Sequence, residues 1–343
     1  MTTQIALWLD NGKFTIGPKD IEHPGPGEVL IRNVAAGLNP IDWKIRDHGF
    51  FMVKEYPAVI GEEGAGVVEE IGVGVTNLIK GDKVFYQSFM TNRCTTFQQF
   101  SIIPADLAGK VPDVITLEQA ASISIGIAPA ALAFYGQRPQ GFEYLPPWED
   151  GGKDKYSRQP IIIMGGASSL GQYAIQLARL SGFSPIIATA SPHNTDLLTS
   201  LGATHIIDRK LPIATFQEEV RKITSTPVEL AFDTVSYPET QQALYDVLAP
   251  EGKMVVSTPP VVATKADDKK TILFVNGTFF LPENKKFGSR FMSALTRMIA
   301  EGEIKTPAIE VIPNGLNGVA LGLERLKNNA VSGKKLVVRP WET

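Results

Sequence analysis

A glycine-punctuated turn in the middle of the chain has residue types and spacing that suit a phosphate group. The turn reads GGASSLG and places Gly165, Ser168 and Gly171 at intervals of three. An apolar run at 161–164 precedes it, an amphipathic pattern follows it, and a second apolar run occupies 185–190. This order predicts strand, turn, helix and strand, in which the turn and the helix N-terminus bind a dinucleotide pyrophosphate.

The turn departs from the common dinucleotide fingerprint at its middle glycine, which is Ser168 here. Gly165 permits the tight turn, and Gly171 lets the helix approach the strand. The hydroxyls of Ser168 and Ser169 are expected to donate to phosphate oxygens. An ordinary strand-to-helix turn is the alternative interpretation of the same residues.

The end of the second strand indicates which dinucleotide binds. An NAD site usually has a carboxylate there, whereas this strand runs into Ser191, His193 and Asn194, with no carboxylate before Asp196. These side chains can donate to a 2′-phosphate, and Arg209 after the next strand adds a positive charge. The pattern favours NADPH over NADH. Capping of the next helix by Ser191 and Asn194 is the alternative.

Composition limits the function classes. The residues are 43% hydrophobic and 20% charged, with a net charge of −3, which is an ordinary composition for a soluble globular protein. At 343 residues the chain is long for a single core, so two domains are expected. No basic excess indicates nucleic acid, and no apolar run is long enough for a membrane span. We expect no signal peptide, and Cys94 alone cannot form an intramolecular disulfide, so a cytoplasmic setting is expected.

The order of patterns predicts an α/β protein with a doubly wound parallel sheet and a second, β-rich domain. Residues 1–125 read as short strands separated by turns, 116–135 as helical, and 139–156 as a loop insertion for which we favour a solvated connection over a contact with substrate or a partner. Beyond the insertion, strands alternate with helices. The expected strands are 161–164, 185–190, 204–208, 228–233, 252–257 and 271–276.

Three motifs resemble the medium-chain dehydrogenase/reductase superfamily. They are GEEGAGVV from Gly61, GDKV from Gly81, and SGKKLVV from Ser332. The resemblance covers essentially the whole chain. It implies a GroES-like catalytic domain over 1–125 and 279–343, and a Rossmann NADPH-binding domain over 126–278.

Zinc-dependent members of that superfamily carry a histidine after the first glycine of the Gly-Glu-Gly motif, and this position is Glu62 here. Cys94 alone excludes a four-cysteine zinc lobe. The four histidines show no ligand-pair spacing: His23, His48, His193 and His205. We therefore expect no metal, and without a Lewis acid alcohol oxidation loses its usual means of polarising the substrate.

The run Asn39-Pro40-x-Asp42-x-Lys44 is similar to zinc-free quinone and enoyl reductases. The altered glycine turn, Ser191 to Asn194, the insertion and the Val331-Ser332 region more closely resemble the fungal trans-acting enoyl reductases of the lovastatin-pathway type and their toxin-cluster relatives. Arg209 stands where that family has a tyrosine. The resemblance implies NADPH contacts by Ile41, Lys44, Ser168, Ser169, Leu170, Gly171, Ser191, His193, Asn194, Val331 and Ser332.

The expected reaction is metal-free reduction of an α,β-unsaturated carbonyl, with hydride added to the β-carbon and a proton to the α-carbon. Lys44, paired with Asp42, is the first candidate for orienting cofactor or substrate, and a surface ion pair is the alternative. Tyr86 is the candidate proton donor, with solvent as the alternative. Substrate-lining candidates, for which core packing is the alternative, are Ile123, Ser124, Ile125, Ile127, Phe274 and Phe279.

Two other functions stay open from the sequence. One is an NADPH-dependent quinone or carbonyl reductase, and the other is an NADPH-binding accessory protein without catalysis. The expected partner is a small-molecule or carrier-bound enone or enoyl substrate, with no nucleic acid and no membrane. The chain is expected to be a monomer or a homodimer.

Overall fold

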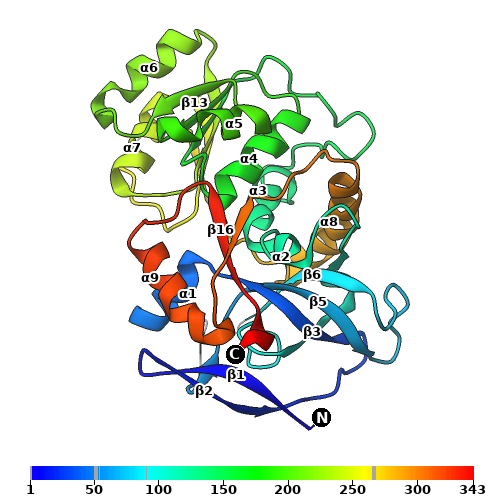
Figure 1. Ribbon diagram of the computed structural model, residues 1–343. Coiled ribbons are helices and arrows are strands. Elements are labelled where there is room, and N and C mark those ends of the chain that lie inside the picture. The colour runs from blue at the N-terminus through cyan, green and yellow to red at the C-terminus, as the bar shows by residue number, and fades with distance from the viewer. Residues whose placement is uncertain (1, 50–52, 54, 90, 265–267) are drawn as a thin grey trace. The chain divides into compact units, whose positions relative to one another are not determined.

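The chain folds into two compact units, each described by itself below (Figure 1). The computed structural model describes residues 2–49, 53, 55–89, 91–264 and 268–343. Unit 1 comprises Met1–Ile125, Thr278–Gly302 and Thr306–Thr343. Unit 2 comprises Gly126–Gly277 and Glu303–Lys305, so it ends one residue earlier than the expected 126–278 and also includes three later residues.

Unit 2 contains the expected doubly wound sheet. Six parallel strands are ordered β11-β10-β9-β12-β13-β14, so the first strand in sequence lies at the centre, where the winding reverses. The strands are β9 (Ile161–Met164), β10 (Ile186–Ala190), β11 (His205–Asp208), β12 (Val228–Asp233), β13 (Leu248–Val256) and β14 (Thr271–Phe274). Every residue of β9 and β10 is buried, which explains why these strands read as unbroken apolar runs.

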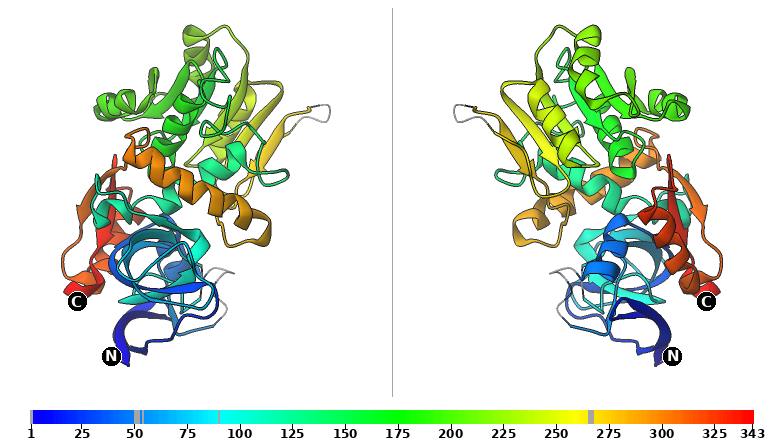
Figure 2. Two further views of the ribbon diagram at one scale, coloured as in Figure 1. Left: turned by 90° about the vertical axis from the view of Figure 1, so that its right-hand side faces the viewer. Right: turned by 90° about the vertical axis from the view of Figure 1, so that its left-hand side faces the viewer.

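Helices cover both faces of this sheet. They are α3 (Ser124–Tyr135, which starts two residues before the unit boundary), α4 (Ser169–Leu180), α5 (Thr195–Leu201), α6 (Phe216–Ile223) and α7 (Pro238–Val247). Helix α4 contacts α5, and α6 contacts α7. The two pairs lie on opposite faces, as right-handed crossovers in opposite directions require, and the views in Figure 2 agree with this arrangement.

The insertion before β9 is packed, which corrects the expectation of a solvated connection. The rings of Tyr144 and Tyr156 meet edge to face at 4.8 Å between centroids, and Tyr156 stacks on Phe183 at 5.3 Å. Trp148 meets Tyr135 at 5.0 Å, and the Leu145 N–H donates to the Tyr156 hydroxyl at 2.6 Å. Aromatic burial therefore orders a segment whose prolines and glycines show no periodicity.

Unit 1 is built on two sheets. A seven-stranded sheet is ordered β15-β16-β3-β5-β6-β8 with β7 paired to β3, and a three-stranded sheet is ordered β2-β1-β4. The strands are β1 (Thr3–Asp10), β2 (Lys13–Asp20), β3 (Glu28–Gly37), β4 (Ala58–Val59), β5 (Glu63–Ile71), β6 (Lys83–Gln87), β7 (Phe100–Pro104), β8 (Ala108–Lys110), β15 (Ala308–Val311) and β16 (Lys334–Val338). The longer helices are α1 (Pro40–His48), α2 (Leu117–Ala120), α8 (Pro282–Ala300) and α9 (Val319–Lys327).

Helix α1 is an element of unit 1 that the sequence patterns did not predict. It starts at Pro40, which suits the first helical position because its missing N–H needs no acceptor there. The Asp42 carboxylate accepts from the Asn39 N–H at 2.8 Å and so closes the helix N-terminus. This short link fixes Asp42 inside unit 1, where it is fully buried.

Candidate functional site

The glycine turn of unit 2 forms a cradle that side chains would fill. Gly165 has a φ of +77°, and an added Cβ would lie 2.6 Å from the Thr234 Oγ1. A Cβ on Gly171 would lie 2.4 Å from the Gly165 carbonyl oxygen. Both positions therefore require glycine, and the first-turn N–H groups of Ser169 and Leu170 have no acceptor within the helix. The turn fits the pyrophosphate of a dinucleotide.

Ser168 shapes this turn instead of presenting a free hydroxyl to phosphate. Its Oγ accepts from the Gly171 N–H at 2.9 Å and lies 2.9 Å from the Thr234 Oγ1. Because Thr234 donates its own proton to the Met164 or Gly165 carbonyl, the Ser168 proton is used toward Thr234. In this arrangement the Ser168 proton is directed at Thr234, and phosphate donation by Ser168, by Ser169 and by the backbone N–H groups stays a prediction.

Ser191 and Arg209 meet at the carboxyl edge of the sheet. Arg209 donates from Nε to the Ser191 Oγ at 2.7 Å, and its backbone N–H donates to the Ala190 carbonyl at 3.0 Å. Neither Ser191 nor Asn194 caps a helix with its side chain, so capping does not account for them. His193 in the same segment is exposed. The edge thus combines a cation with a hydroxyl, as a 2′-phosphate site requires.

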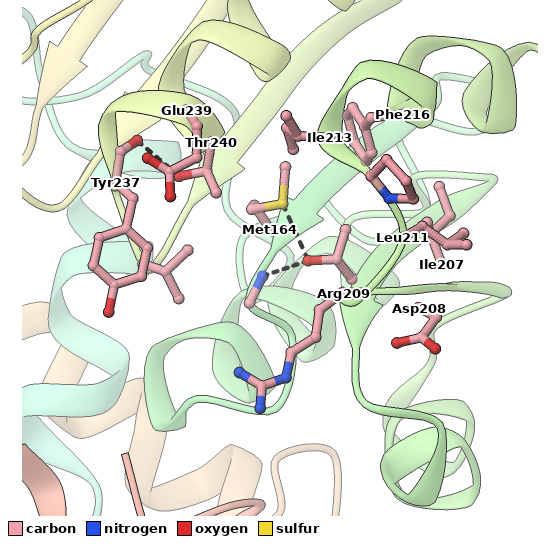
Figure 3. Close-up of a pocket in the computed structure, with 14 residues that line it drawn as sticks. Met164, Ile207, Asp208, Arg209, Leu211, Ile213, Phe216, Tyr237, Glu239 and Thr240 are labelled. Carbon is pink, nitrogen blue, oxygen red and sulfur yellow. Dashed lines mark hydrogen bonds between the residues drawn. The ribbon is translucent and has the colours of Figure 1, made fainter. Parts of the chain in front are cut away.

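A cavity of about 240 Å³ opens at the carboxyl ends of β9 to β12. In Figure 3, Ile207, Leu211 and Phe216 gather on one side of it, and Tyr237 and Thr240 lie on the other. The guanidinium of Arg209 points away from the apolar side chains. A slot with apolar walls and a polar rim fits the adenine and its ribose.

Sequence reasoning found only two residues of this cavity, Gly165 and Arg209. The others lie within the last residues of β9, β10 and β11 or in the segments that follow β11 and β12. The signal that could have found them is positional, because the ends of neighbouring parallel strands share one edge.

In unit 1, Ile41 and Val331 pack against one apolar cluster, although 290 positions separate them in the sequence. Ser332 beside Val331 is exposed. Lys44 is partly buried, and its ammonium lies over the Trp43 ring, 5.8 Å from the centroid. The expected Asp42–Lys44 pair does not form, because positions i and i+2 face different sides of a helix and Asp42 binds the Asn39 N–H instead.

Tyr86 is placed in the core of the large sheet. Its ring is fully buried, and its hydroxyl donates to the Asn33 Oδ1 at 2.5 Å. Burial raises its pKa far above the ordinary tyrosine value, so release of its proton is strongly disfavoured. We therefore leave Tyr86 out of the candidate catalytic group.

The expected substrate-lining residues differ in how far they are buried. Ile123, Ile127 and Phe279 are fully buried and agree with the core-packing alternative. Phe274 is 48% exposed on the edge strand β14. Ser124 is buried, and its Oγ has no hydrogen-bond partner among the residues that the structure describes. The Ile125 N–H donates to the Glu63 Oε2 at 2.9 Å, which links this segment to a buried charged cluster.

That cluster contains three carboxyl groups and one ammonium. Lys335 forms an ion pair with Glu63 and donates to the Asn39 Oδ1 at 2.7 Å, and the Asn39 amide donates to Glu63 at 3.1 Å. Burial raises the pKa of Asp42 to about 7 and that of Glu62 to about 8, with each value also affected by neighbouring carboxylates. Within the described residues, no group of three or more His, Cys, Asp or Glu side chains is arranged to hold a metal ion.

The comparisons with known proteins agree with this architecture. Residues 25–113 match the alcohol dehydrogenase GroES-like domain, and residues 169–302 match the zinc-binding dehydrogenase family. A trans-enoyl reductase of Aspergillus japonicus is 30% identical over 345 residues, covering 97% of this chain and 96% of that protein. A trans-enoyl reductase of Gibberella zeae is 30% identical over 334 residues, covering 90% and 89%.

Solved structures show the same fold. A candidate zinc-dependent alcohol dehydrogenase from Rhizobium etli has a TM-score of 0.81 at 22% identity, covering 99% of this chain and 98% of that one. A crotonyl-CoA carboxylase/reductase variant in complex with NADP has a TM-score of 0.77 at 17% identity, covering 98% and 95%.

A nucleotide-binding parallel sheet together with a GroES-like β unit defines a two-domain oxidoreductase. The chain belongs to the medium-chain dehydrogenase/reductase superfamily, close to the fungal trans-enoyl reductases. No helix in the described part of the chain is long and apolar enough to cross a membrane.

Proposed function

We propose that this protein is an NADPH-dependent, zinc-independent enoyl reductase that saturates the carbon–carbon double bond of an α,β-unsaturated carbonyl compound. The observation that carries the proposal is the 30% identity to a trans-enoyl reductase over 97% of the chain. The substrate is a free or carrier-bound enone or enoyl compound, and the setting is the cytoplasm.

The residues of unit 2 fit the cofactor. Backbone N–H groups at Ser169 and Leu170 would hold the pyrophosphate, the apolar slot would hold the adenine, and Arg209 with Ser191 would hold the 2′-phosphate. When bound, NADPH supplies the hydride for the β-carbon of the substrate.

Zinc independence is supported by the residues at the relevant positions. Glu62 takes the place of the metal-binding histidine, and Glu63 is already paired with Lys335. Polarisation of the substrate carbonyl then depends on hydrogen-bond donors of the protein.

The reaction is tested with a panel of enones and NADPH, followed at 340 nm, with identification of the product. We expect a saturated ketone, deuterium at the β-carbon when deuterated NADPH is supplied, and unchanged turnover after treatment with a chelator. An alcohol or hydroquinone as the product would support a carbonyl or quinone reductase. Tight NADPH binding without hydride transfer would indicate the accessory role.

Lys44 remains a proposed contact of cofactor or substrate. Replacing Lys44 by alanine is expected to weaken NADPH binding or turnover while the fold persists, because the buried residues of α1 are Asp42 and Ile45 and Lys44 is only partly buried. Binding is measured by NADPH fluorescence and folding by circular dichroism. Wild-type kinetics in this variant would remove Lys44 from the site.

A further inference from the structure

The buried charged cluster of unit 1 contains two carboxyl oxygens that the protein leaves unpaired. These are Asp42 Oδ1 and Glu62 Oε1, both buried and without a hydrogen-bond partner among the residues that the structure describes. Glu63, next in sequence, is in contrast fully engaged by Lys335, Asn39 and the Ile125 N–H. Unpaired buried carboxyl oxygens are rare because they are costly, so this pair needs an explanation.

Charge balance favours a proton on this pair of carboxyl groups. The charged groups that act on Glu62 are Asp42 on α1, Glu63 at the start of β5, and Lys335 on β16. With all three carboxyl groups ionised, one ammonium would face three negative charges in a buried place. Desolvation and repulsion between Asp42 and Glu62 therefore favour the neutral acid, with Glu63 keeping Lys335 as its partner.

Glu62 is the member of the pair that can pass this proton on. Asp42 is fully buried and tied to the Asn39 N–H, whereas the Glu62 residue is partly exposed. The backbone of Glu62 is held firmly: its carbonyl accepts from the Ser88 N–H at 2.7 Å, and the Gly61 carbonyl accepts from the Ser88 hydroxyl at 2.8 Å. The backbone position of the acid is thus fixed, and its buried Oε1 is the oxygen without a hydrogen-bond partner among the described residues.

Other proton-bearing side chains of unit 1 are less suited to this task. The Tyr86 proton is donated to Asn33, and burial makes its release harder. Cys94 is partly buried, and desolvation raises the pKa of its thiol. Lys335 is committed to Glu63 and Asn39.

We propose that Glu62 is the general acid of this enzyme and that Asp42 keeps it protonated. This rests on the proposed enoyl reduction, which consumes one hydride and one proton. After hydride reaches the β-carbon, the Glu62 O–H bond breaks and its proton forms the new C–H bond at the α-carbon of the enolate. The electron pair of the O–H bond stays on the Glu62 carboxylate, which takes a proton back from solvent before the next turnover.

The first test needs no cofactor and no substrate. Infrared spectra of the isolated protein at pH 7 are expected to show a protonated carboxylic acid band that disappears in Glu62→Gln. The band should titrate at a lower pH in Asp42→Asn, because one negative neighbour is lost. Glu69→Gln on the same strand is the matched control, because Glu69 pairs with Lys80 and lies away from the cluster.

The second test measures turnover of an enone under saturating NADPH. Glu62→Gln is expected to lower kcat at least 100-fold with NADPH affinity within twofold of wild type, since a positioned acid contributes about 10²–10⁴-fold. Wild-type kcat should fall as pH rises through about 8, and this fall should move to lower pH in Asp42→Asn. Glu69→Gln should keep the wild-type profile.

The outcomes separate the two proposals. If wild type reduces enones and Glu62→Gln does so equally fast with the same pH profile, the acid role is wrong and enoyl reduction stands. If wild type reduces no enone, the proposed function fails, and the acid role fails with it. If no acid band is assignable to Glu62, the proposal that Asp42 keeps Glu62 protonated is refuted.

Discussion

The Arg209 guanidinium is the contact that should separate NADPH from NADH, and Arg209→Ala tests this directly. Its Nε is already used on the Ser191 hydroxyl at 2.7 Å, which leaves the terminal nitrogens as further donors. A hydrogen bond to a charged group contributes about 1.5–3 kcal/mol. Because Arg209 is exposed, solvent screens the interaction, and we take about 1–2 kcal/mol. The expected loss is about 5- to 30-fold in NADPH affinity.

Fluorescence titrations with both cofactors measure this effect. The Kd for NADH should stay within about twofold of wild type, because NADH lacks the 2′-phosphate, and the NADPH preference should shrink further at high salt. Lys210→Ala is the matched control, since Lys210 is the exposed neighbouring cation. The NADPH affinity of Arg209→Lys should lie between those of wild type and Arg209→Ala, because lysine keeps the positive charge but loses the planar, bidentate donor geometry of arginine. An equal loss for both cofactors, or the same loss in Lys210→Ala, would refute a specific phosphate contact.

Two further substitutions test the interior of unit 1. Lys335→Met should destabilise the protein by about 3–5 kcal/mol at neutral pH, because Glu63 would stay buried without its cation. Urea unfolding measures this loss, and an unchanged unfolding midpoint would contradict the prediction. Tyr86→Phe should cost about 1–3 kcal/mol, because the Asn33 Oδ1 loses its buried donor, while enone turnover stays within about twofold. A large drop in kcat at unchanged stability would return Tyr86 to the catalytic candidates.

The nucleotide-binding sheet could be predicted from the sequence because its signals are local. The runs 161–164 and 186–190 are buried at every residue, so they read as short apolar segments that are easily recognised. Gly165 and Gly171 predict the turn because an added Cβ would clash at both positions. All six expected strands occur in the observed sheet.

Other features depended on contacts that no local pattern records. Helix α1 has only nine residues, and its N-terminal signals, Asn39, Pro40 and Asp42, precede no long apolar period. The insertion is ordered by rings such as Tyr156 on Phe183, which meet only after folding. The proposed adenine slot combines the carboxyl ends of four strands, β9 to β12, so Phe216 and Tyr237 belong to no local sequence motif.

The carboxyl cluster shows that a sequence motif can be interpreted correctly without revealing all the contacts of its residues. In the sequence, Glu62 only marks the absence of a zinc-binding histidine. In the structure, it lies in a cluster with Asp42, Glu63 and Lys335, which come from α1, β5 and β16. Protonation depends on that assembly, because a carboxyl group stays neutral near pH 7 only where burial and like charge outweigh hydration. We propose that glutamate at the position of the zinc-binding histidine supplies an acid, because a reductase that works without metal needs a proton source of this kind.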